Sequence, residues 1–143
     1  MSAREVNVER WVMRYARIAL GAAFLSGIAD RFGLWGKTIG YGDFAHFVQY
    51  TAQVNSFMPA STIPFLAWAA TVAELVLGIA LISGVWLRWT ALASALLLVL
   101  FGTAMAISFG LKSPLDYSVF SASAAALLLA VRSSGLSSPP PLP

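Results

Sequence analysis

Glu74 is the residue whose type and position most strongly indicate chemistry in this sequence. It is the only ionisable side chain in the apolar run from Pro64 to Leu87. A helix of that length, at ~1.5 Å per residue, crosses a hydrocarbon core of ~30 Å. A carboxylate at such depth is costly and therefore suggests a proton relay or a ligand site. The alternative is a protonated carboxyl that forms a hydrogen bond and only packs between helices.

Arg31 is the cation whose expected depth best fits Glu74. Counted from the basic helix ends at ~1.5 Å per residue, Arg17 lies ~10 Å deep, Glu74 ~21 Å and Arg31 ~31 Å. Helical side chains lean toward the N-terminus of their own helix, so Arg31 leans toward Glu74 and Arg17 leans away. We therefore expect Arg31 to contact Glu74, directly or through one water. We expect Arg17 to be an intramembrane cation that extends to the inner headgroups.

Five more polar residues are expected near the same membrane surface and complete the candidate polar or ligand site: Asp30, His46, Lys112, Asp116 and Tyr117. Asp116 is also explained as an acid in the first turn of a helix that Ser113 caps. Tyr117 either anchors at the membrane surface or donates a hydrogen bond to a ligand carbonyl. His46 has no second histidine or cysteine with which to share a metal, so we expect no metal site. No residue is assigned a catalytic role.

The composition is that of a membrane protein. Only 10% of the residues are charged and 59% are hydrophobic, whereas soluble domains are roughly 25% charged. The net charge of +3 comes from scattered Lys and Arg, so nucleic acid is not an expected partner. The sequence has no cysteine, which excludes disulfides, thiol redox chemistry and iron–sulfur ligation. Any electron carrier must be diffusible or belong to a partner.

The hydrophobic pattern predicts an all-α integral membrane four-helix bundle, with an additional amphipathic interfacial helix between helices 1 and 2. We expect one membrane domain over residues 11–132, with spans at about 11–32, 63–87, 89–111 and 114–131. The amphipathic segment is expected at about 43–58, with Phe44, Phe47 and Val48 in the outer leaflet and His46 and Gln53 facing water or the mouth of the site. Residues 1–10 are expected to be a cytoplasmic segment, and the Pro/Ser-rich tail 133–143 to be disordered.

The basic residues near the span ends predict the orientation. One side holds Arg4, Arg10, Arg14, Arg88 and Arg132, and the other Arg31, Lys37 and Lys112. The excess places both termini in the cytoplasm. We expect a multi-pass protein of a prokaryotic plasma (inner) membrane, surrounded by the lipid bilayer. A cleaved signal peptide at the N-terminus is the alternative, but its removal leaves an odd number of spans. Three glycines are expected to form helix-packing faces: Gly21, Gly27 and Gly78.

Three stretches of the sequence carry a family resemblance: RIALGAAFLSGIADRFGLWG, AELVLGIALISGVWLRW and LKSPLDYSVFSASAAALLLA. They resemble the DoxX family of small four-helix membrane proteins, and the resemblance covers about residues 14–131. It matches five residues to the polar and glycine positions of the family: Arg17, Gly21, Arg31, Glu74 and Gly78. Family members more often carry lysine where this chain has Arg31. The resemblance implies a membrane subunit of quinone-linked sulfur oxidation or of a membrane redox or stress complex.

Three functions remain open at this point. In the first, Glu74, Arg31 and Asp30 provide the proton and the compensating charge for a quinone, and a redox protein partner provides the electrons. Quinone would then be a noncovalent cofactor, and no covalently bound cofactor is expected. The second function is a structural or assembly subunit, alone or as a homo-oligomer, which explains the small-residue helix faces without a site. The third is a small-molecule or proton pathway, for which four short helices with one intramembrane acid are poorly suited.

Overall fold

The computed structural model describes residues 3–135, which are helical apart from the turns. The helices are α1 (Ala3–Arg31), α2 (Phe44–Val54), α3 (Ile63–Ser83), α4 (Leu87–Phe109), α5 (Lys112–Asp116) and α6 (Val119–Gly135), with the short 3₁₀ helix η1 (Ala60–Thr62) before α3. The all-α prediction is confirmed for this part of the chain.

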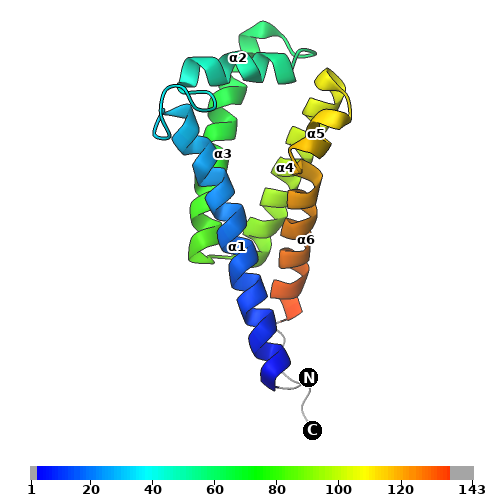
Figure 1. Cartoon of the computed structure of the whole chain (residues 1–143). Helices are drawn as coiled ribbons and strands as arrows, with labels where there is room; N and C mark the ends of the chain where they lie inside the picture. The colour runs from blue at the N-terminus through cyan, green and yellow to red at the C-terminus, as the bar shows by residue number, and fades with distance from the viewer. Residues whose placement is uncertain (1–2, 136–143) are drawn as a thin grey trace.

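The long helices form two antiparallel pairs, α1 with α3 and α4 with α6 (Figure 1). A tight turn over residues 84–86 joins the pairs at one end, and the pairs diverge toward the other end. There α2 lies across the molecule and packs against both α3 and α4. The N-terminal end of α1 and the C-terminal end of α6 lie toward the same end, opposite α2 (Figure 1).

Within residues 3–135, three helices are long and apolar enough to cross a membrane: α1, α3 and α4. The apolar part of α6, Val119–Ser133, is shorter. Only 22% to 28% of the residues in the most apolar windows of the three helices are buried within the protein. Most of their apolar surface therefore faces outward, as expected of helices that contact lipid. Trp86 and Trp89 are exposed beside Arg88 at the turn between α3 and α4, which is typical of the membrane–water boundary.

The crossing of α1 and α3 depends on two facing glycines. A Cβ atom added to Gly21 would lie 2.8 Å from the carbonyl oxygen of Gly78 and 2.7 Å from Cγ1 of Ile82. A Cβ atom added to Gly78 would lie 3.1 Å from the side chain of Leu25. The two backbones thus approach more closely than any residue with a side chain allows. This close contact fixes the position of α1 against α3.

Several helix ends differ from the ends of the predicted spans. α1 begins at Ala3, so the first helix extends over residues 3–10, beyond the predicted span. Glu5 in its first turn stabilises this start, because an acid there opposes the positive end of the helix dipole. α3 ends at Ser83, since Gly84 adopts a φ of 76° and caps the helix in the left-handed conformation. α4 begins at Leu87, two residues earlier than expected.

The predicted fourth helix is broken into α5 and α6. Ser118 adopts a φ of 55°, which lies outside the right-handed helical region and separates the two helices. The capping role expected of Ser113 is wrong, because α5 begins at Lys112 with Leu111 as N-cap and no side-chain cap bond. α6 continues to Gly135, into the region predicted to be disordered. The rest of that tail, residues 136–143, lies outside the described residues.

A helix occupies the predicted amphipathic segment, but its apolar face does not lie as expected. Phe47, Thr51 and Val54 are buried, because α2 packs this face against α3 and α4. The prediction that Phe47 enters the outer leaflet is therefore wrong. His46 and Gln53 are exposed, as predicted.

Candidate functional site

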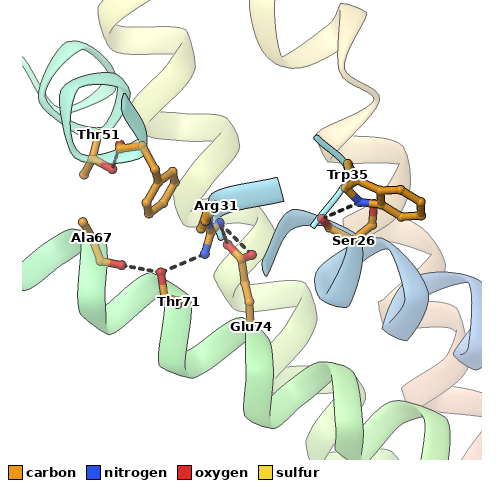
Figure 2. Close-up of polar contacts among 8 residues, drawn as sticks. Ser26, Arg31, Trp35, Thr51, Ala67, Thr71 and Glu74 are labelled. Atoms are coloured by element: carbon orange, nitrogen blue, oxygen red, sulfur yellow. Dashed lines mark hydrogen bonds and ion pairs between the residues drawn. The ribbon is translucent and has the colours of Figure 1, made fainter. Parts of the chain in front are cut away.

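Arg31, the last residue of α1, forms an ion pair with Glu74 in the middle of α3 (Figure 2). Its Nη2 atom donates to both carboxylate oxygens, at 2.8 Å each. The two residues are only 5% and 4% exposed. A buried charge needs such a partner, because the interior solvates an isolated ion poorly. The comparison of depths predicted a contact between these two residues, either direct or through one water, and the structure shows the direct one.

Two further residues hold the guanidinium of Arg31 in place. Its Nη1 atom donates to Oγ1 of Thr71 at 3.0 Å, and the Thr71 hydroxyl donates to the carbonyl of Ala67 at 2.8 Å (Figure 2). The ring of Phe47 also contacts the guanidinium, with its centroid 3.7 Å from Cζ of Arg31, a cation–π contact. Arg31 therefore connects α1, α2 and α3 at one point.

The sequence analysis did not assign Thr71 or Phe47 to the site. Thr71 precedes Glu74 by three residues and so lies on the same face of α3, which is a signal that identifies it from sequence. Phe47 carries no such signal, since periodicity shows which residues share a face but not what that face contacts.

Gly27 lies beside the ion pair. It lies one turn before Arg31, and a Cβ atom added to it would be 3.4 Å from Oε2 of Glu74 and 3.9 Å from Nη2 of Arg31. The sequence analysis assigned Gly27 to helix packing. In the structure, the side of Gly27 on which a side chain would project faces the carboxylate of Glu74.

Asp30 stabilises the loop between α1 and α2. Its Oδ2 atom accepts a hydrogen bond from the backbone N–H of Tyr41 at 3.1 Å, and its carboxylate lies where a side chain of Gly40 would stand. Burial, reinforced by the neighbouring Tyr50, raises the pKa of Tyr41 above its ordinary value, so the phenol stays protonated. Within residues 3–135 the only hydrogen bond of the Asp30 side chain is to this loop, so the structure does not join the Asp30 carboxylate to Arg31.

The remaining polar candidates form their own surface pairs. His46 Nδ1 lies 3.0 Å from Oδ1 of Asp43, and both side chains are exposed. Asp43 caps α2 by accepting the N–H of His46 at 2.9 Å, which lowers the pKa of Asp43. Lys112 pairs with Asp116 one turn later on α5, and this pair is also exposed. Residues 3–135 contain no group of three His, Asp or Glu side chains that would hold a metal ion.

Arg17 lies far along α1 from the ion pair. Its guanidinium packs so closely against Gly84 that a Cβ atom there would collide with it. Gly84 caps the C-terminal end of α3, the negative end of the helix dipole, which favours a nearby cation. The structure thus separates Arg17 from Glu74.

A pocket of about 220 Å³ lies between the two helix pairs, and Glu74 and Tyr117 contribute to its lining. The other lining residues are apolar and come from α1, α4 and α6, among them Phe24, Leu98 and Phe101. Tyr117 and the lining residue Ala23 are exposed, so the pocket opens at the side of the bundle. A larger hollow of about 770 Å³ lies at the opposite end of α1, near Arg132, away from the ion pair.

The comparisons with known proteins give one match. The family model described as DoxX matches residues 12–108, which is more than half of the chain and includes Arg31 and Glu74. No curated protein and no solved structure matches the chain.

Proposed function

This chain belongs to the DoxX family, and from that premise we propose that it is a multi-pass membrane subunit that binds a membrane quinone, in one of its oxidation states, in the pocket lined by Glu74 and Tyr117. The observation that carries the proposal is the presence of one buried carboxylate in the lining of an otherwise largely apolar pocket. Such a pocket suits a ligand that has an apolar body and a hydrogen-bonding head.

The size and opening of the pocket support a quinone head group. Its volume of about 220 Å³ is below the ~300–1,000 Å³ of sites that enclose a whole drug-sized ligand. One substituted ring would fill it, and the isoprenoid tail would leave through the side opening into the lipid. The opening lies beside Ala23 and Tyr117, which are exposed on the flank of the bundle.

The polar residues of the pocket support a role in proton exchange. Conversion between a quinone and its hydroquinone moves protons as well as electrons, and a positioned carboxylate is suited to accept the proton that a hydroquinone hydroxyl releases. Glu74 would be that group, and Arg31 would hold the compensating positive charge. Tyr117 has a hydroxyl that both donates and accepts hydrogen bonds. Because the sequence has no cysteine and one histidine, we assign the electron transfer to a redox protein partner.

Photoaffinity labelling tests this proposal. We expect a short-chain photoreactive quinone, applied in its oxidised and its reduced form, to label peptides that contain Leu98, Phe101 or Tyr117. Ala122→Trp fills the pocket and should reduce labelling at least about ten-fold. Leu128→Trp is the matched control, since Leu128 lies on the same helix but is 67% exposed outside the pocket. Equal labelling of the two variants would refute the pocket as the site.

We propose that α6 is a fourth span, that α2 lies at the outer surface of a prokaryotic inner membrane, and that both termini are cytoplasmic. The antiparallel order of the four long helices supports this, because α1 begins and α6 ends at the same end of the molecule (Figure 1). Reporter fusions at Gly40 and Ser134 should fall on opposite sides of the membrane. Reporters on the same side would contradict the four-span topology.

The alternative function is a structural or assembly subunit. One observation favours it: the charge of Arg31 is already matched within the protein by Glu74, Thr71 and Phe47. A network of that kind is sufficient to stabilise the bundle without a ligand. The two functions predict different results when the ion pair is removed: labelling of the pocket falls if the pair binds the ligand and remains if the pair is only structural.

A further inference from the structure

The ionised state of Glu74 restricts the head groups that the pocket can bind. Arg31 donates to both carboxylate oxygens at 2.8 Å, and a guanidinium remains charged in proteins. Within the buried pair, the full positive charge of the Arg31 guanidinium favours the carboxylate form of Glu74. An ionised carboxylate accepts hydrogen bonds and donates none.

The carboxylate still has capacity for a ligand. A carboxylate offers about four lone-pair sites, and within residues 3–135 each oxygen of Glu74 accepts one hydrogen bond, both from Nη2 of Arg31. The hydrogen bonds of Thr71 run to Ala67 and from Arg31, so Thr71 leaves these sites open. Among the pocket residues, only Tyr117 has another side-chain group that hydrogen-bonds.

The two oxidation states of a quinone differ in what they offer to these open sites. The ring oxygens of a quinone are carbonyls, which only accept hydrogen bonds. A quinone placed against Glu74 therefore brings two acceptors together, its carbonyl and the carboxylate, and excludes the water that could donate to the carboxylate. The ring oxygens of a hydroquinone are hydroxyls, which donate to a carboxylate in a short, charge-assisted hydrogen bond. A buried polar group without a hydrogen-bond partner destabilises a complex by more than a paired group stabilises it.

We infer that the pocket selects the reduced, hydroquinone form, with one ring hydroxyl donating to Glu74. The inference rests on the proposed function and specifies its ligand. Tyr117 has a different role. Its hydroxyl forms a hydrogen bond with either oxidation state, because it can donate to a quinone carbonyl and accept from a hydroquinone hydroxyl. Glu74 therefore determines the selectivity, and Tyr117 adds affinity without it.

Three small ligands with the same tetramethyl-substituted ring test this inference in detergent under argon: tetramethylhydroquinone, tetramethylbenzoquinone and the dimethyl ether of the hydroquinone. We expect the wild-type protein to bind the hydroquinone at least about ten-fold more tightly than the other two, which lack the donor. Tighter or equal binding of the benzoquinone would overturn the inference and leave the proposed function standing. Failure of all three to compete with the photolabel would overturn both.

Two variants distinguish the contribution of Glu74 to ligand selectivity from that of the rest of the pocket. Glu74→Gln replaces the carboxylate with an amide that both donates and accepts, so we expect the preference to fall to about three-fold or less. Tyr117→Phe should weaken the hydroquinone and the benzoquinone by similar factors and keep their ratio. A preference that survives Glu74→Gln would show that another group selects the ligand and would overturn the inference. If Glu74→Gln does not fold, the wild-type comparison and Tyr117→Phe decide the matter alone.

Discussion

Replacement of Arg31 by leucine should lower the free energy of unfolding by about 3–5 kcal/mol, because it leaves the carboxylate of Glu74 buried without its counter-charge. The substitution also removes the hydrogen bond to Thr71 and the cation–π contact with Phe47. Unfolding in mixed detergent micelles, followed by circular dichroism, measures the effect. Arg14→Leu is the matched control on the same helix, since Arg14 is exposed and should change stability by about 1 kcal/mol or less.

The second substitution at the pair shows whether the two residues act together. Glu74→Gln in the Arg31→Leu protein removes the unpaired charge, so the double variant should regain part of the lost stability. The loss in the double variant should then be smaller than the sum of the single losses by at least about 1 kcal/mol. Losses that add to within about 0.5 kcal/mol would show that Arg31 and Glu74 do not interact.

Gly21→Val should lower the free energy of unfolding by about 1–3 kcal/mol or more, because it forces α1 away from α3. The first atom of the new side chain would lie 2.8 Å from the carbonyl oxygen of Gly78. That oxygen belongs to the backbone and cannot rotate aside, so the helices must separate. Ala22→Val is the matched control, since Ala22 is the adjacent residue and is exposed. Equal stability of the two variants would contradict the close crossing of α1 and α3.

The contact between Arg31 and Glu74 was predictable from the sequence because helices are regular. A fixed rise per residue converts positions along two spans into depths, and the lean of helical side chains decides which pairs approach. The same regularity predicted the long apolar helices. It also predicted the glycines that bring α1 and α3 together, since small residues at one face favour a close crossing.

The contacts that depend on tertiary arrangement were not predictable in the same way. The apolar face of α2 was evident from its spacing, but spacing does not distinguish a face covered by lipid from one covered by protein, and Phe47 lies against Arg31. The break at Ser118 requires a positive φ, which sequence does not indicate in a residue other than glycine. The pocket arises where the two helix pairs diverge. Its apolar lining comes from several helices, so a pattern along the sequence could not predict it.

The measurement that tests the central claim most directly is photolabelling of the pocket in the Arg31→Leu, Glu74→Gln double variant, compared with the wild-type protein at the same folded fraction. The account predicts that the double variant regains part of the stability lost in Arg31→Leu, but that labelling of the peptide containing Tyr117 falls at least about ten-fold. The pair is then part of a ligand site as well as of the bundle. Labelling that remains at the wild-type level in the stable double variant would contradict this claim and leave the pair with a structural role only.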